Sequence, residues 1–171
     1  MTSISAEGAH AVAVSGDFDD CQDMVKACFN DKAFRDEMHL SAVNSINWAR
    51  LMPQIVYYFS SALALGAPDR KVAFSVPTGN FGNVFAGYVA MRMGLPIERL
   101  IVASNRNDIL TRFFEQGAMQ RDNVVPSLSP SMDIQVSSNF ERLLFEMLER
   151  DGVKTKSLMD EFAARGEFTL D

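Results

Sequence analysis

A segment containing glycine and asparagine carries the strongest chemical signal in the sequence. It covers residues 77–83 and reads PTGNFGN, after an apolar run and before a helical pattern. Two glycines let the backbone approach an anion closely, and the free N–H groups and dipole of a helix start favour negative charge. A phosphate group is the natural ligand of such a segment. Because the segment lacks the Gly-Lys-Ser/Thr ending of a nucleotide P-loop and the three-glycine dinucleotide fingerprint, a tight strand-to-helix turn that needs glycine for its dihedral angles is the alternative.

Four polar residues earlier in the chain form a second candidate site. Asn44, Ser45, Asn47 and Arg50 lie within two helical turns of one another. Arg50 can donate charge-assisted, bidentate hydrogen bonds to a phosphate, and the Asn and Ser side chains add neutral donors. The competing interpretation is a helix cap at Ser45 and a solvated Arg50 beside Trp48.

Metal and thiol chemistry have little support in the sequence. His10 and His39 have no carboxylate or cysteine at metal-ligand spacing, so no metal site is expected. Cys21 and Cys28 lie two helical turns apart. That spacing corresponds to about 10 Å and is too long for a disulfide, so both are expected to be free thiols.

Composition narrows the class of protein. The chain has 171 residues, of which 47% are hydrophobic and 22% charged, as in one soluble globular domain or slightly more. Its 16 Lys and Arg against 22 Asp and Glu give a net charge of −6, which disfavours nucleic acid as a partner. The most apolar stretch, residues 55–67, is too short to span a bilayer, and residues 1–10 lack the pattern of a secretory signal or transit peptide. A cytoplasmic protein is expected.

The elements expected around the two candidate sites begin with one strand and two helices. Residues 10–16 predict a strand, and Asp17 is expected to cap a helix that follows it. The buried face of that helix should hold Phe18, Cys21, Val25 and Cys28. A long amphipathic helix is expected from Trp48 to near Gly66 and Pro68. Pro53 either kinks it or begins its regular part, and in the second case residues 44–50 form a separate turn.

The middle of the chain predicts one right-handed βαβ unit. Residues 71–77 and 100–104 are near-continuous apolar runs, as in strands buried on both faces of a parallel sheet. The helix between them has Phe81, Phe85, Tyr88 and Met91 at helical spacing and should end at Gly94. These strands and helices predict an α/β fold, with a parallel sheet that has helices on both faces.

Further elements are expected after this unit. Asn107 should cap a helix that stops at Gly117, and residues 124–135 should form a strand stub and an ordered loop. Ser138 and Glu141 have the spacing of a capping box ahead of another helix. A last helix should end near Gly166, and residues 168–171 predict the beginning of a strand.

Four segments have residue sequences that identify a protein family more closely than general structural patterns do. They are AVAVSGDFDDCQDMVK (residues 11–26), NSINWAR (44–50), SVPTGNFGN (75–83) and SPSMDIQVSSNFERLLFE (129–146). Together, and in this order, they resemble the threonine synthase family, over residues 9–145. The resemblance implies a pyridoxal-phosphate-dependent enzyme of the fold type II class, with the fold of the tryptophan synthase β subunit.

The resemblance implies a reaction and the residues that serve it. The reaction converts O-phospho-L-homoserine and water to L-threonine and phosphate, with pyridoxal 5'-phosphate, held by a lysine Schiff base, as the electron sink. In the family, the loop that matches Gly79, Asn80, Phe81, Gly82 and Asn83 cradles the cofactor phosphate through backbone amides. The residues that match Asn44, Ser45 and Arg50, together with Asn83, bind the substrate phosphate. Residues 1–40 correspond to the end of a small mobile domain, and residues 41–171 to the opening part of the large cofactor-binding domain.

The catalytic lysine of the family has no match in this chain. The lysines are Lys26, Lys32, Lys71, Lys154 and Lys156, and none corresponds to the Schiff-base residue, so no catalytic residue is assigned. The chain is therefore expected to be an internal segment that is inactive alone, lacks flanking segments of the enzyme and exposes surfaces that favour self-association. Two alternatives remain. One is a non-catalytic remnant or split module that binds a phosphorylated ligand or a partner chain. The other is a different pyridoxal-phosphate lyase, which would share the PTGNFGN loop but not NSINWAR.

Overall fold

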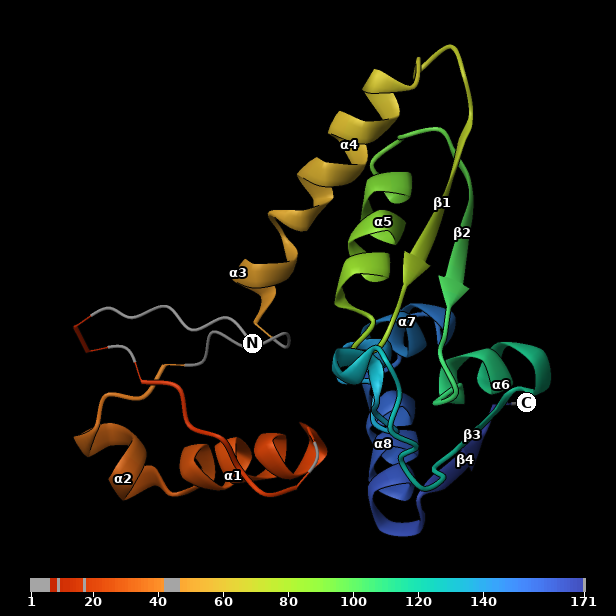
Figure 1. The fold of residues 1–171 in the computed structure, drawn as a ribbon. Coiled ribbons are helices and arrows are strands. Elements are labelled where there is room, and N and C mark those ends of the chain that lie inside the picture. The colour runs from red at the N-terminus through yellow and green to blue at the C-terminus, as the bar shows by residue number, and fades with distance from the viewer. Residues whose placement is uncertain (1–6, 9, 17, 42–46, 171) are drawn as a thin grey trace. The chain divides into compact units, whose positions relative to one another are not determined.

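The computed structural model describes residues 7–8, 10–16, 18–41 and 47–170. The chain divides into two compact units, Met1–Leu40 and Ser41–Asp171 (Figure 1). The assignment of these units to the small and large domains of an enzyme stays a prediction.

The first unit contains two helices that pack on each other, α1 (Phe18–Asn30) and α2 (Lys32–Glu37). Asp31 begins α2, because its carboxylate accepts a hydrogen bond from the Phe34 N–H at 3.0 Å. The helix at α1 is confirmed, whereas the predicted cap, Asp17, lies outside the described residues.

Two predictions for the first unit are wrong. Residues 10–16 form no strand, and Val12 is 82% exposed. The part of this unit that the structure describes offers no second strand for pairing, and a single strand leaves its backbone groups without partners. Val25 and Cys28 of α1 are exposed rather than buried, since among the described elements of the unit only the short α2 packs on α1. The expectation of free thiols is confirmed for both cysteines.

The second unit is built around the predicted βαβ arrangement. Strand β1 (Val72–Pro77) pairs in parallel with β2 (Ile97–Ala103), and helix α5 (Gly82–Arg92) connects them. The register runs from Val72 opposite Ile97 to Pro77 opposite Ala103. Both strands therefore deliver their carboxyl ends to the same edge (Figure 1). The α/β class with a parallel sheet is confirmed, although β2 begins at Ile97 rather than at residue 100.

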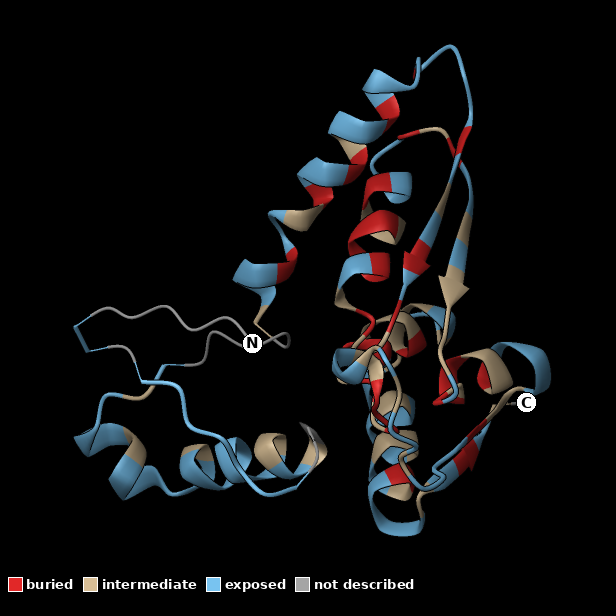
Figure 2. Cartoon of the chain, viewed as in Figure 1, coloured by how far each residue is buried: buried red, intermediate tan, exposed pale blue. Residues whose placement is uncertain are grey.

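Burial on both faces of the strands was also predicted, and this is wrong for β1 and for β2, where Ile101 is 46% exposed. In β1, Val72 and Val76 are buried, whereas Ala73, Ser75 and Pro77 are exposed. Figure 2 shows buried residues concentrated along α5, whereas along β1 exposed positions alternate with buried or half-buried ones. The described sheet that contains β1 has two strands, and one face of β1 is exposed.

Helix α4 (Gln54–Ala64) covers the buried face beside α5. The ring of Tyr58 meets Phe74 of β1 edge-on, with centroids 4.8 Å apart. Pro53 occupies the N-cap position of α4, and a separate short helix, α3 (Trp48–Leu51), precedes it. Of the two predicted roles of Pro53, the start of a regular helix is therefore confirmed.

The rest of the second unit completes the core. Its elements are α6 (Ile109–Gln116), β3 (Ala118–Gln120), a 3₁₀ helix (Pro130–Met132), α7 (Phe140–Met147), α8 (Gly152–Arg165) and β4 (Glu167–Thr169). Strands β3 and β4 pair antiparallel. Phe113, Phe140 and Phe168 lie at the centre of this part, each 2% exposed. The predicted stops of α6 at Gly117 and α8 at Gly166 are confirmed.

Three predictions in this region need correction. Residues 124–135 contain no strand, and the strand forms earlier, at Ala118–Gln120. Asn107 does not cap α6, because Asp108 takes the N-cap position. The capping box of Ser138 and Glu141 is also wrong, since Asn139 occupies the N-cap of α7 and makes no side-chain cap hydrogen bond. In two of these cases a distant part of the chain binds the polar side chain instead.

Candidate functional site

The predicted phosphate loop lies at the carboxyl ends of the two parallel strands. Thr78 fixes its start: the Thr78 N–H donates to the Ala103 carbonyl of β2 at 2.9 Å, and its hydroxyl donates to the Val76 carbonyl at 2.7 Å. Thr78 is buried. The loop therefore leaves the sheet at the edge where open α/β sheets bind their ligands.

Phe81 turns the loop into helix α5. Its backbone is left-handed, with φ at 61°, and it occupies the N-cap position of the helix. This conformation costs a non-glycine residue about 1–2 kcal/mol. Packing offsets the cost, because the Phe81 ring is 4% exposed and meets the Phe140 ring edge-on with centroids 5.4 Å apart.

Residues 137–139 donate hydrogen bonds to two carbonyl groups of the loop, and the loop's backbone amides have no acceptor among the described residues. The Ser137 hydroxyl donates to the Gly79 carbonyl at 2.7 Å. Asn139 donates to the Asn80 carbonyl through its backbone N–H at 3.1 Å and its side-chain Nδ2 at 3.0 Å. Among the described residues, none accepts a hydrogen bond from the backbone N–H groups of Gly79 to Asn83. Successive amides of this kind at a helix start form a cradle for an anion.

The glycines serve close packing rather than special dihedral angles. Neither Gly79 nor Gly82 has a positive φ, so the alternative interpretation of a turn that needs glycine for its dihedral angles is wrong. A Cβ atom on Gly79 would lie 3.3 Å from the Ser131 carbonyl oxygen and 3.4 Å from Ile134 Cδ1. The segment at residues 131–134 thus lies against the loop, and a side chain at Gly79 would push the two apart.

The structure brings Arg50 to the same cavity as the loop. The cavity measures about 190 Å³. Its lining residues are Arg50, Gln54, Pro77, Thr78, Gly79, Asn80, Phe81, Gly82 and Asn83. Arg50 is the only charged residue in this described lining, and a guanidinium group attracts an anion. The other predicted ligands of the second candidate, Asn44 and Ser45, lie outside the described residues.

Two residues that the sequence did not single out hold Asn83 in this cavity. Gln54 Oε1 accepts a hydrogen bond from Asn83 Nδ2 at 3.1 Å. The Tyr58 hydroxyl donates to Asn83 Oδ1 at 2.8 Å and to the Asn83 carbonyl at 3.0 Å. Burial raises the pKa of Tyr58 to about 12, so its hydroxyl stays protonated and remains a donor. The spacing of four residues from Arg50 to Gln54 and from Gln54 to Tyr58 is the signal that could have found them.

A buried polar network fixes the segment that packs on Gly79. Asp133 Oδ1 accepts hydrogen bonds from Asn105 Nδ2 at 2.7 Å, Asn107 Nδ2 at 3.0 Å and Ser127 Oγ at 2.6 Å. The Ser127 hydroxyl is the main cause that lowers the pKa of Asp133 from its ordinary value. Asn107, predicted to be a helix cap, belongs to this network instead. Its role is to hold residues 125–133 in place beside the loop.

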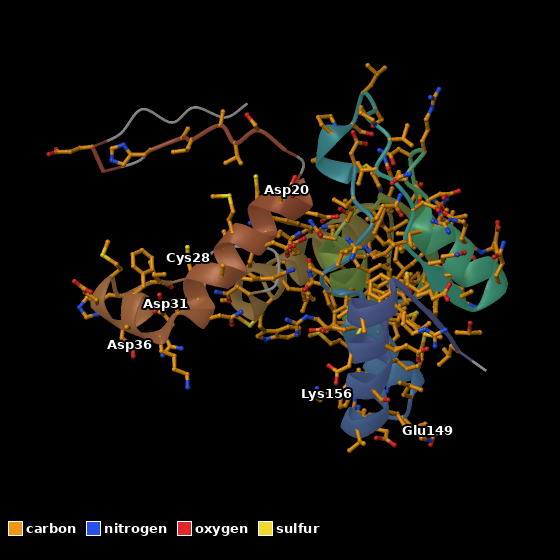
Figure 3. The ribbon with its side chains drawn as sticks, turned by 90° about the horizontal axis from the view of Figure 1, so that it is seen from below. Asp20, Cys28, Asp31, Asp36, Glu149 and Lys156 are labelled. Atoms are coloured by element: carbon orange, nitrogen blue, oxygen red, sulfur yellow. The ribbon has the colours of Figure 1, made fainter. Side chains whose placement is uncertain are left out.

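The lysines of the chain are not among the described residues that line the cavity. All five are exposed. Lys26 pairs with Asp23 at 2.9 Å, and Lys156 pairs with Asp160. Figure 3 shows Lys156 on α8, at the surface of the second unit. In the part of the chain that the structure describes, no group of three His, Cys, Asp or Glu residues could hold a metal ion, and no described helix is long and apolar enough to cross a bilayer.

The fold and the anion cradle agree with a comparison to protein families. A family model described as "Pyridoxal-phosphate dependent enzyme" matches residues 2–166. The chain belongs to this family.

Individual relatives carry a more specific name. The chain is similar over its whole length to the threonine synthases of Pseudomonas aeruginosa, at 59% identity, and Saccharomyces cerevisiae, at 46% identity. It covers 36% of each of these proteins, so it spans about a third of the relatives' length. The resemblance to threonine synthase is thereby confirmed.

Solved structures give the same result. The crystal structure of pyridoxal-phosphate-bound threonine synthase from Brucella melitensis matches 95% of this chain, with 61% identity and a TM-score of 0.86, and the chain covers 35% of that protein. Threonine synthase from Escherichia coli matches 80% of this chain with 39% identity and a TM-score of 0.74, and the chain covers 32% of it.

Proposed function

We propose that the cavity at the carboxyl ends of β1 and β2 binds phosphate groups for a threonine synthase of which this chain forms one segment. The observation that carries the proposal is that one cavity contains Arg50 and the backbone amides of Gly79 to Asn83, for which the described residues provide no acceptor. The donor set fits an anion, because it combines backbone N–H groups, one guanidinium and no described carboxylate.

The loop amides are assigned to the phosphate of pyridoxal 5'-phosphate. Gly79, Asn80, Phe81, Gly82 and Asn83 present their N–H groups at the start of α5, where the helix dipole adds to the attraction. When bound, the cofactor supplies an electron sink for the loss of phosphate from the substrate and the addition of water. The contribution of the loop is to hold one end of the cofactor in a fixed position.

Arg50 is assigned to the phosphate of O-phospho-L-homoserine, together with Asn44, Ser45 and Asn83. A guanidinium can bind a phosphate through two parallel hydrogen bonds, which fixes orientation as well as affinity. Arg50 belongs to α3, ahead of the sheet, while Asn83 belongs to α5. In this proposal the substrate phosphate therefore lies between two helices that meet at the end of the sheet.

In this proposal the chain supplies parts of two domains of the enzyme, and flanking segments supply the rest. Residues 1–40 are proposed to be the end of a small mobile domain and residues 41–171 the opening part of the large domain, so that closure excludes water from the site. Exposed apolar residues on α4 support further association: Val56 is 59% exposed, Tyr57 63% and Leu63 59%. We expect flanking segments of the enzyme, or another copy of the chain, to cover them. The chain alone should show no threonine formation, and measurable turnover by the pure chain would contradict this.

Substitution of Arg50 tests the assignment of the substrate phosphate. We expect the chain to bind O-phospho-L-homoserine more tightly than L-homoserine in a calorimetric titration. Arg50→Ala should weaken binding of the phosphorylated ligand about 10- to 100-fold, since a hydrogen bond to a charged group contributes about 1.5–3 kcal/mol. Arg99→Ala removes the same charge from an exposed position on β2 and is the matched control. Equal affinities for the two ligands, or an unchanged affinity in Arg50→Ala, would contradict the proposal.

A further inference from the structure

Gln54 connects the two groups of residues to which the phosphates are assigned. It is the first residue of α4 and is half-buried in the wall of the cavity. Its Oε1 accepts from Asn83 Nδ2 at 3.1 Å, and its Nε2 donates to the backbone carbonyl of Arg50 at 2.8 Å. One amide side chain thus bonds to α5 through its oxygen and to α3 through its nitrogen.

The contacts of Asn83 show why this matters for a ligand. Its Oδ1 accepts from the Tyr58 hydroxyl at 2.8 Å, which leaves the amide nitrogen facing Gln54. A primary amide has two N–H donors, and Gln54 is the only acceptor that the described residues provide for Asn83 Nδ2. The second N–H is therefore available to a phosphate oxygen in the cavity. Without Gln54, the amide would lose the partner that directs its nitrogen.

The second contact acts on the backbone of α3. This helix has four residues, Trp48–Leu51, and Pro53 separates it from α4. A helix this short has little stability of its own. The bond from Gln54 to the Arg50 carbonyl ties α3 to the first turn of α4 across Pro53, and so limits the positions from which the guanidinium can approach the cavity.

We propose that Gln54 is a positioning residue, which orients the Asn83 amide and holds Arg50 so that both donate to the same phosphate. This rests on the proposed phosphate-binding function of the cavity. Gln54 acts through its neighbours, so its removal should weaken binding without removing the cradle of backbone amides. The expected loss is about 3- to 10-fold in affinity, because two neutral hydrogen bonds of modest net strength disappear.

Inorganic phosphate is the probe that tests this inference, with the full chain labelled with ¹⁵N. Gln54→Met removes both hydrogen bonds and keeps the length of the side chain. We expect a 3- to 10-fold higher Kd for phosphate and a changed chemical shift of the Asn83 side-chain amide. Gln54→Asn keeps the amide but is too short to reach both partners, and it should also weaken binding. Gln116→Met makes the same chemical change at an exposed position outside the cavity and should alter neither quantity.

The outcomes separate this inference from the function on which it rests. If the unmodified chain fails to bind phosphate, both are overturned. If Arg50→Ala weakens phosphate binding while Gln54→Met leaves the Kd and the Asn83 amide signal unchanged, the function stands and the role of Gln54 is wrong. A lower melting temperature of Gln54→Met with an unchanged Kd, measured well below that temperature, would show a merely structural role and would also overturn the inference.

Discussion

Gly87 links the packing of the second unit to the geometry of the cavity. A Cβ atom on Gly87 would lie 2.6 Å from Tyr58 Cε1, 2.7 Å from Tyr58 Cζ and 3.0 Å from Leu100 Cδ2. These distances are far below van der Waals contact, so Gly87→Ala must displace the Tyr58 ring. That ring is buried and packs against Phe74. Its hydroxyl holds Asn83, and displacement should therefore disturb the phosphate site as well as the core.

The size of the effect follows from three contributions to the free energy of unfolding. Overpacking of a filled core costs about 1–3 kcal/mol. Loss or lengthening of the hydrogen bonds from Tyr58 to Asn83 costs about 1 kcal/mol. The higher helix propensity of alanine offsets about 1 kcal/mol, since Gly87 lies inside α5. Gly87→Ala should therefore lower the free energy of unfolding by about 1–3 kcal/mol.

Urea denaturation and phosphate titration measure the two consequences. Gly152→Ala is the matched control, because a Cβ atom there would meet only Phe145 Cε2, at 4.0 Å, and the residue begins a helix without a positive φ. The control should change the free energy of unfolding by less than about 0.5 kcal/mol and leave phosphate binding unaltered. If Gly87→Ala proves as stable as the unmodified chain, the reasoning about Tyr58 is wrong.

Three further predictions concern groups that support the site. Burial raises the pKa of Tyr58 from 10.0 to about 12, so the stability it contributes is complete below about pH 10 and is lost as the pH rises to about 12. The free energy of unfolding should fall by about 2 kcal/mol over this pH range. The prediction would be refuted if denaturation curves showed the same pH dependence for Tyr58→Phe as for the unmodified chain. Hydrogen bonds, led by that from Ser127, lower the pKa of Asp133 from 3.8. The stability that the Asp133 carboxylate contributes to the fold is therefore present above pH 3.8 and is lost as the pH falls through the lowered pKa. Asp133→Asn should flatten this dependence of stability on acid pH. Asn139→Ala removes the side-chain donor to the Asn80 carbonyl and should lower the free energy of unfolding by about 1–3 kcal/mol and weaken phosphate binding, whereas an unchanged Kd would show that Asn139 does not orient the loop.

The βαβ unit could be predicted because its signals are local. Apolar runs mark β1 and β2, helical spacing marks α5, and glycine or proline marks each end. The two possible roles of Pro53 could not be separated from sequence, since both are compatible with its missing N–H. The structure shows the helix start.

Pairing and capping depend on partners that local patterns do not reveal. Residues 10–16 have the composition of a strand, yet a strand needs a neighbour and none is described in that unit. Asn107 looks like a helix cap, but its side chain bonds to Asp133 and to the Val125 carbonyl, 26 and 18 residues away. Ser138 bonds instead to the Asn80 side chain, 58 residues away. Tertiary contacts override these local signals.

The residues of the site also divide into those that local sequence predicts and those that only distant contacts reveal. The PTGNFGN loop was found because its residue types and its place after a strand are contiguous in sequence. Gln54 and Tyr58 were missed, since their contacts with Asn83 span 29 and 25 residues. The left-handed backbone of Phe81 was not predicted, because packing against Phe140 stabilises a conformation that local propensity disfavours.

The loop amides themselves provide the most direct test of the proposed phosphate site. The measurement is a titration of the ¹⁵N-labelled chain with pyridoxamine 5'-phosphate and, separately, with pyridoxamine, neither of which has an aldehyde that could react with the exposed lysines. The phosphorylated compound should shift the backbone amide signals of Gly79 to Asn83 in a saturable manner, and pyridoxamine should leave them unchanged. Equal shifts with both compounds, or no shift at these residues with either, would contradict the assignment of the loop to the cofactor phosphate.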